Sequence, residues 1–144
     1  MTVADLIGPR QRVYTIREDD TVHDAARYLR EMHIRSVGVI DAGGKLVGVL
    51  SQGDISHQVV AENKCPAWIR VHEIMTRDLV TVAPDCSIEG CQRLLEQHAI
   101  HHLPVVAPDG EYWGMVSITD LLHVVVGDLQ SRADLLESFI FSSR

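Results

Sequence analysis

The sequence contains few aromatic residues and no long apolar run. Aromatic residues make up only 5% of a chain that is 46% hydrophobic, so we expect a core of Val, Leu, Ile and Ala. No apolar stretch approaches the roughly 20 residues that a membrane-spanning helix needs. The first twelve residues also lack the apolar segment of a signal peptide. These absences predict a cytoplasmic protein without a membrane partner.

Positive charge and cysteine are scarce as well. The formal net charge is −7, and Lys45 and Lys64 are the only lysines. Binding to a nucleic-acid backbone requires a basic surface, so the composition argues against a nucleic-acid partner. Cys65, Cys86 and Cys91 do not form a Cys-x-x-Cys motif, which is typical of reduced, cytoplasmic thiols.

One seven-residue pattern occurs twice. Residues 48–54 read Gly-Val-Leu-Ser-Gln-Gly-Asp, and residues 114–120 read Gly-Met-Val-Ser-Ile-Thr-Asp. The final aspartates stand 120 − 54 = 66 positions apart, and the two halves match without gaps back to Thr15 and Thr81. Such a regular repeat indicates two copies of one supersecondary unit.

Each copy predicts a β-α-β-β-α unit. Thr21 and Ser87 stand where the first helix of each copy needs its N-cap, directly before apolar residues at helical spacing. Residues 41–44 and 107–110 have the composition of hairpin connections. A second helix is predicted through Val60 in one copy and through Val126 in the other. The predicted strands are 13–16, 37–40 and 46–50 in the first copy, and 79–82, 103–106 and 113–116 in the second.

The chain is predicted to consist of repeats 1–64 and 65–127 and a helical tail, 128–144. Short helical lead-ins at 2–7 and 71–75 precede the first strand of each repeat. Because a unit of about 60 residues is marginal alone, we expect an α+β fold in which the repeats pack with pseudo-twofold symmetry. The apolar tail is expected to dock on the body or on a dimer partner.

These features resemble a tandem pair of CBS domains, the Bateman module. The resemblance rests on the two Gly-x-x-Ser-x-x-Asp stretches, the run Ile100–Val106 and the run Val80–Asp85, and it covers residues 1–127. Gly38 departs from it, since the family usually has proline there. The resemblance implies a regulatory or sensor module, not an enzyme, that binds AMP, ADP, ATP or S-adenosylmethionine in clefts between the repeats. It also implies a homodimer that acts on an unidentified protein target, with the nucleotide as regulatory ligand and no cofactor.

The repeated aspartates have two explanations. In the simpler one, each Ser-x-x-Asp is a capping box that begins a helix. In the functional one, the carboxylate of Asp54 or Asp120 accepts hydrogen bonds from both hydroxyls of a ribose. The two roles are compatible.

By the family's geometry, each ligand site combines residues of both halves. A threonine faces the adenine, aliphatic side chains sandwich the ring, and His, Arg or Ser contacts the phosphate. The first site would contain Thr15, Ile34, Arg35, His101, His102, Met115, Ser117, Thr119 and Asp120. The second would contain Thr81, Ile100, His101, Arg35, Ser36, Val49, Ser51 and Asp54. The first has more hydroxyl donors, so we expect it to bind the nucleotide better. The simpler alternatives are core positions for the aliphatic residues, a solvated charge at a helix end for Arg35, and a surface pair for the histidines.

Three other functions compete with this interpretation. A hydrolase triad of Ser117, His102 and Asp120 lacks a Gly-x-Ser-x-Gly elbow, and the first repeat has no histidine at the position of His102. A metal site is not predicted, because neither the histidines of the second repeat nor the cysteines have zinc-site spacing. A degenerate CBS pair that serves as a protein-interaction or dimerisation platform without nucleotide remains the third alternative.

Overall fold

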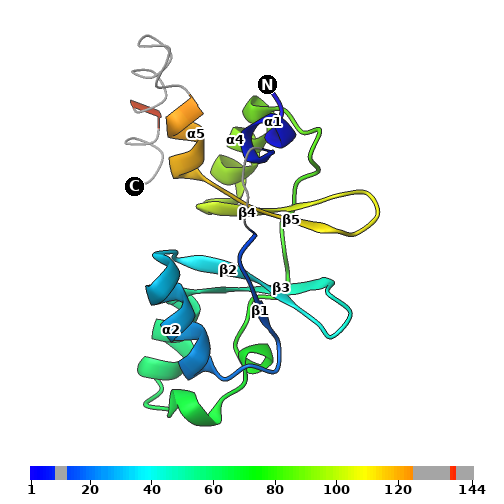
Figure 1. The fold of residues 1–144 in the computed structure, drawn as a ribbon. Helices are drawn as coiled ribbons and strands as arrows, with labels where there is room; N and C mark the ends of the chain where they lie inside the picture. The colour runs from blue at the N-terminus through cyan, green and yellow to red at the C-terminus, as the bar shows by residue number, and fades with distance from the viewer. Residues whose placement is uncertain (9–12, 125–136, 139–144) are drawn as a thin grey trace. The chain divides into compact units, whose positions relative to one another are not determined.

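The computed structural model describes residues 1–8, 13–124 and 137–138, which divide into two compact units (Figure 1). The repeat-1 unit contains residues 13–79 and 109–112. The repeat-2 unit contains residues 1–8, 80–108, 113–124 and 137–138. The N-terminal segment therefore belongs to the unit of the second repeat.

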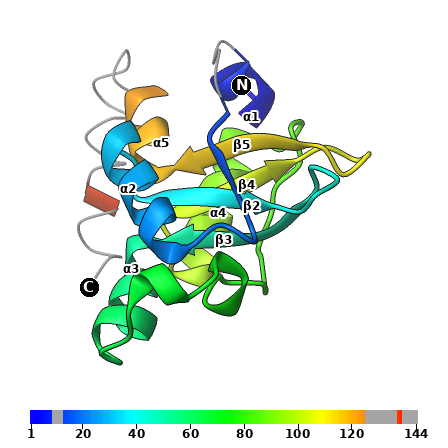
Figure 2. The same ribbon diagram turned by 60° about the horizontal axis from the view of Figure 1, so that its bottom comes forward.

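The repeat-1 unit contains a three-stranded sheet with β2 (Ser36–Ile40) in the middle (Figure 2). Strand β1 (Thr15–Arg17) runs parallel to β2, and β3 (Leu46–Ser51) runs antiparallel to it. The predicted hairpin connection between β2 and β3 is confirmed. The Asp41 side chain accepts hydrogen bonds from the amides of Gly43 and Lys45 and so fixes this turn.

Two helical segments complete the first repeat. Helix α2 (Val22–Met32) begins at the predicted cap, where the Thr21 hydroxyl accepts a 3.1 Å hydrogen bond from the Asp24 amide. The second segment starts as α3 (Gln52–Ile55) and continues as a π-helix, Ser56–Val60. The predicted helical run through Val60 is thus confirmed, with a change of helix type that the sequence did not indicate. Two 3₁₀ turns, Pro66–Trp68 and Val71–Glu73, follow in the linker.

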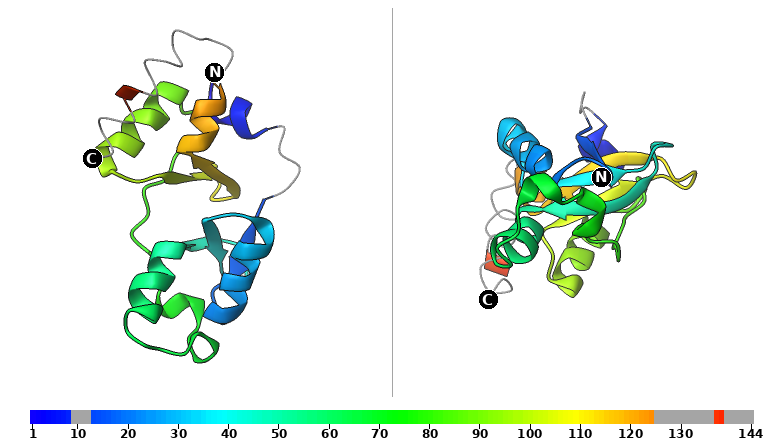
Figure 3. Two further views of the ribbon diagram at one scale, coloured as in Figure 1. Left: turned by 90° about the vertical axis from the view of Figure 1, so that its left-hand side faces the viewer. Right: turned by 90° about the horizontal axis from the view of Figure 1, so that it is seen from below.

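From its first helix onward, the second repeat has the same order of elements (Figure 3). Its elements are α4 (Ile88–His98), β4 (His102–Val106), β5 (Tyr112–Ser117) and α5 (Ile118–Val124), with β4 paired to β5. The Ser87 hydroxyl caps α4 by accepting a 2.9 Å hydrogen bond from the Gly90 amide. Helices α2 and α4 end alike, at His33 and Ala99, which both adopt the left-handed conformation.

The first strand of the second repeat is shorter than predicted. Only Val82 forms a bridge, a parallel one to Val105, where the first repeat has the strand β1. In the first repeat the amide of Glu18 donates to Ile40 and extends the pairing. The equivalent residue in the second repeat is Pro84, which has no amide hydrogen to donate.

The N-terminal helix α1 (Val3–Ile7) confirms the predicted lead-in and packs into the repeat-2 unit. The amide of Val3 donates to the carbonyl of Cys86 at 2.8 Å, and that of Ala4 donates to the carbonyl of Pro84 at 2.7 Å. Val3 and Ile7 are buried in the same cluster as the core of the second repeat.

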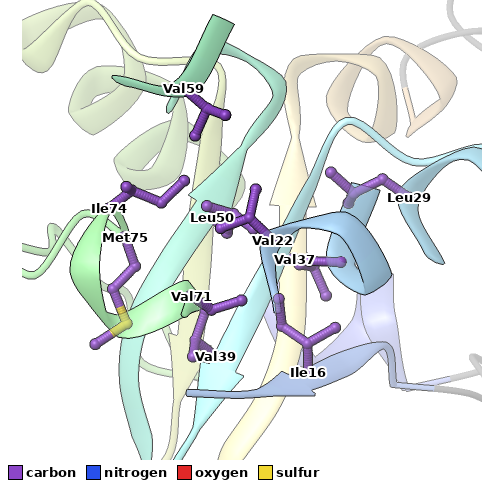
Figure 4. Packing of buried hydrophobic residues seen from close by; sticks show 11 residues of the cluster. Ile16, Val22, Leu29, Val37, Val39, Leu50, Val59, Val71, Ile74 and Met75 are labelled. Atoms are coloured by element: carbon purple, nitrogen blue, oxygen red, sulfur yellow. The ribbon is translucent and has the colours of Figure 1, made fainter. Parts of the chain in front are cut away.

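The second lead-in, 71–75, makes the equivalent contacts in the repeat-1 unit. The amide of Val71 donates to the carbonyl of Asp20 at 2.9 Å, and that of His72 donates to the carbonyl of Glu18 at 3.0 Å. Figure 4 shows Val71, Ile74 and Met75 directed into the cluster that the sheet and α2 of the first repeat form. Each lead-in therefore completes the core of the other repeat.

The β-α-β-β-α order predicted from the sequence is confirmed as an α+β fold. Within the described ranges, no helix is long and apolar enough to cross a membrane. Most of the predicted tail, 128–144, lies outside the described residues, as does Val126. Of its described part, Ser138 donates a 3.3 Å hydrogen bond from its hydroxyl to the carboxylate of Glu96 on α4.

Candidate functional site

In the first repeat, Ser51 and Asp54 form the predicted capping box at the start of α3. The Ser51 hydroxyl accepts a hydrogen bond from the Asp54 amide at 3.1 Å, and the Asp54 carboxylate accepts one from the Ser51 amide at 2.9 Å. Both side chains are half-buried. The capping explanation of this motif is therefore confirmed, and the same carboxylate remains a candidate ligand group.

The second repeat repeats this geometry at the start of α5. The Asp120 carboxylate accepts from the amide and the hydroxyl of Ser117, at 2.8 and 3.1 Å. The Asp120 amide donates back to the Ser117 hydroxyl at 3.2 Å. Thr119, between them in sequence, is exposed, and the equivalent residue of the first repeat is Gly53.

The residues predicted to hold phosphate lie beside these helix starts. The carbonyl of Arg35 accepts from the Gln52 amide at 3.0 Å, and the carbonyl of His101 accepts from the Ile118 amide at 3.1 Å. These two bonds occupy equivalent positions in the two repeats. They place the segment before β2, and the segment before β4, next to the respective Ser-x-x-Asp motif.

Ser36 is the most buried of the polar residues predicted for the site. It stands opposite Ser51 in the pairing of β2 with β3, and only 8% of its surface is exposed. Among the described residues, its hydroxyl oxygen has no hydrogen-bond partner. A buried hydroxyl usually finds a partner, so this oxygen is a candidate for ligand or water contact.

The aliphatic residues divide into two pairs. Ile34 and Ile100 pack against the cores of their own repeats, which agrees with the simpler explanation of these positions. Val49 and Met115 are only half-buried and belong to neither core cluster. They lie on β3 and β5, close in sequence to Ser51 and Ser117, and remain candidates for contact with an adenine ring.

In each repeat, the Ser-x-x-Asp motif thus lies next to the residue predicted to hold phosphate. Most of the predicted site residues are at least partly accessible, and Ser36 is the single buried member. The half-buried members are Thr15, Ile34, Val49, Ser51, Asp54, Ile100, His102, Met115, Ser117 and Asp120, and the exposed ones are Arg35, Thr81, His101 and Thr119. The combination of residues from both repeats into one site stays a prediction.

Sequence reasoning missed Thr76, a linker residue that contacts the Ser-x-x-Asp motif of the first repeat. Its hydroxyl donates to the Asp54 carboxylate, 3.2 Å from Oδ1 and 3.4 Å from Oδ2. Thr76 lies 22 residues beyond Asp54 and outside the matching part of the repeats, so no local pattern connects the two.

Titratable side chains offer little further chemistry. Among the described residues, no three His, Cys, Asp or Glu side chains gather where they could hold a metal ion. Burial raises the pKa of the Cys91 thiol to about 11. Cys91 is therefore an inert part of the second core.

The comparisons with known proteins agree with this geometry. The sequence profile of the CBS domain matches residues 3–61 and 71–127. A putative signal-transduction protein with CBS domains from Burkholderia ambifaria MC40-6 is 31% identical, with a TM-score of 0.81 over 90% of this chain and 97% of its own. The CBS domain pair of protein MJ0100, solved in complex with 5-methylthioadenosine and S-adenosyl-L-methionine, is 26% identical. Its TM-score is 0.77, over 88% of this chain and 97% of its own.

An enzyme also contains a related region. The inosine-5′-monophosphate dehydrogenase of Korarchaeum cryptofilum is 34% identical over 111 residues, or 77% of this chain. The chain spans only 22% of that enzyme's length. The similarity is therefore to a part of the dehydrogenase.

Proposed function

This chain belongs to the CBS-domain family as a tandem CBS-pair regulatory module, and from that premise we propose that it binds ligands containing adenosine. AMP, ADP, ATP and S-adenosylmethionine are the candidates. The protein is proposed to act through this binding, without catalysis of its own. The same proposal includes the homodimer, the cytoplasmic location and the protein target expected from the sequence. Light scattering measures whether the chain is a homodimer.

The observation that carries the proposal is that each repeat has a half-buried capping aspartate at a helix start, five residues after a half-buried aliphatic residue of the preceding strand. These residues are Asp54 and Val49 in one repeat, and Asp120 and Met115 in the other. A carboxylate suits the two adjacent hydroxyls of a ribose, and an aliphatic side chain suits the face of a purine ring. The adenosyl ligands of the MJ0100 pair support the same chemistry.

The copy that ends at Asp120 is proposed to be the stronger site. It has hydroxyl groups on both Ser117 and Thr119, whereas the other copy has Gly53 in place of the second hydroxyl. Its neighbour at the start of β4 is His102, and the corresponding residue of the first repeat is Ser36. A histidine that is protonated beside a phosphate attracts it more strongly than a hydroxyl does.

Thermal unfolding with a panel of AMP, ADP, ATP, S-adenosylmethionine and GMP tests the proposal. A ligand at 100 times its dissociation constant adds about 2.7 kcal/mol of stability. For a chain of this length, that corresponds to an increase in Tm of about 5–10 °C. We expect such an increase with at least one adenosine compound and a smaller one with GMP.

The variants Asp120→Asn and Asp54→Asn assign the effect to a repeat. Loss of a charge-assisted hydrogen-bond acceptor is expected to weaken binding about 10- to 100-fold at the stronger site. Asp120→Asn should therefore remove most of the increase in Tm, and Asp54→Asn a smaller part. If no adenosine compound shifts Tm, the platform function without nucleotide is the better explanation.

A further inference from the structure

The linker between the repeats is held tightly against the first sheet beside Asp54. Val49 of β3 and Thr76 exchange two backbone hydrogen bonds, of 3.0 and 2.9 Å, so the linker adds a short antiparallel pairing to the edge of the sheet. Gly48 makes this approach possible. A Cβ atom at Gly48 would lie 2.6 Å from Sδ of Met75 and 3.0 Å from the carbonyl oxygen of Thr76.

This pairing delivers the Thr76 hydroxyl to the Asp54 carboxylate. Oδ2 of Asp54 already accepts from the Ser51 amide at 2.9 Å, as the cap requires. The Thr76 hydroxyl then lies 3.2 Å from Oδ1 and 3.4 Å from Oδ2, so it touches both carboxylate oxygens. Typical O–H···O hydrogen bonds are about 2.7–2.8 Å long, and this contact is therefore a weak one that a better donor can replace.

The hydroxyl of Thr76 has the same hydrogen-bonding chemistry as a ribose hydroxyl. A ribose diol needs both oxygens of a carboxylate, because each of its two hydroxyls donates to one of them. We propose that Thr76 is an internal competitor at Asp54, which weakens the binding of an adenosine ligand in the first repeat. This inference rests on the proposed function, since it concerns which ligands reach Asp54 and how tightly.

The competing donor does not come from the motif itself. The cap bonds of Asp54 come from Ser51. The threonine comes from the linker and is fixed there by backbone pairing rather than by its own side chain. The competitor is therefore present whether or not a ligand is bound, and only the orientation of its hydroxyl has to change.

Isothermal titration calorimetry in the Asp120→Asn background isolates the Asp54 site. The probes are AMP and S-adenosylmethionine, which share the ribose diol, and 2′-deoxy-AMP, which lacks one of its hydroxyls. Thr76→Val removes the hydroxyl and keeps the side-chain shape, and Thr76→Ser is the matched control that keeps the hydroxyl. Thr76 is exposed, so neither change is expected to prevent folding.

We expect Thr76→Val to tighten AMP binding about 3- to 10-fold, as loss of a competing hydrogen bond implies. Thr76→Ser should leave it unchanged. The preference for AMP over 2′-deoxy-AMP should also increase in Thr76→Val, because both carboxylate oxygens then accept from the ribose. A substitution that only loosened the linker would not produce this change in preference.

If Thr76→Val and Thr76→Ser bind AMP with equal affinity, or if Thr76→Val binds it more weakly, the inference is wrong. Binding of AMP by the wild type would still support the proposed function. The inference is also wrong if the wild type binds AMP but Asp120→Asn does not, either alone or combined with Thr76→Val. If wild type and every variant bind neither probe, the proposed function itself fails. The wild-type titration therefore separates the two failures.

Discussion

The two copies of Gly-x-x-Ser-x-x-Asp have the same cap and different surroundings. In both, the serine hydroxyl accepts from the aspartate amide and the carboxylate accepts from the serine amide. Around this shared cap, the first glycine has a different function in each copy. Gly48 leaves room for Met75 and Thr76. Gly114 has φ = +129° and, among the described residues, no neighbouring atom within 4 Å of the position that a Cβ would occupy.

The difference between the two copies shows which structural properties a repeated motif determines by itself. The two reciprocal capping bonds are present in both copies because they depend on local sequence alone. Contacts with the linker depend on where that segment runs, as the bond from Thr76 to Asp54 shows. The aspartates are thus alike as helix caps, while bonds that reach them from outside the motif depend on the path of the chain.

The largest expected effect concerns the lead-ins, each of which packs into the core of the other repeat. Val3 and Val71 are fully buried, each in the core of the repeat to which its lead-in does not belong by sequence. Val3→Asp buries an unpaired charge and should destabilise by more than about 3 kcal/mol. Hydrogen exchange should then increase mainly in residues 80–124, and after Val71→Asp mainly in residues 13–60.

The opposite pattern would show that each lead-in stabilises its own repeat. The exposed neighbour Asp5 provides a control, since Asp5→Asn should change exchange far less in either repeat. Asp5 lies in a separate capping box, where hydrogen bonds from Thr2 lower the pKa of its carboxyl group.

The next prediction distinguishes the structural roles of Gly48 and Gly114. Gly114→Ala forces a side chain into a backbone conformation that glycine favours and should cost about 1–3 kcal/mol. Gly48→Ala should cost a similar amount for another reason, the collision with Met75. Denaturant unfolding in a Met75→Ala background distinguishes the causes. The cost of Gly48→Ala should decrease there by about 0.5 kcal/mol or more, and the cost of Gly114→Ala should not.

Equal costs of Gly48→Ala with and without Met75 would contradict the close-approach role. In that case the linker would yield to an added methyl group without loss. The pairing that brings Thr76 to Asp54 would then be looser than the distances imply.

The order of helices and strands could be predicted because it depends on local features. The caps at Thr21 and Ser87, the apolar spacing on α2 and α4, and the hairpin at Asp41 all follow from residues close in sequence. Because the pattern occurs twice, each predicted element was supported by its counterpart in the other repeat. The candidate carboxylates could be found for the same reason, since Ser-x-x-Asp is a local pattern.

The exchange of lead-ins and the Thr76 contact could not be predicted. Val3 and Val71 are equivalent apolar residues, and either could fill either core, so the choice depends on the path of the whole chain. Thr76 reaches Asp54 only because Val49 pairs with the linker and Gly48 permits the approach. Such long-range contacts leave no pattern in a single sequence.

The smallest expected effect concerns the shortened first strand of the second repeat. Pro84 has no amide to donate, whereas the equivalent Glu18 donates a 3.1 Å hydrogen bond to Ile40. Pro84→Ala restores an amide that can donate to Val106, and it also increases the freedom of the unfolded chain. Because these contributions oppose each other, the free energy of unfolding should change by less than about 1 kcal/mol. The informative measurement is amide exchange by NMR, in which the new amide of residue 84 should exchange slowly, like that of Glu18. Rapid exchange at residue 84 would mean that the backbone around it, rather than the missing hydrogen, ends the strand at Val82.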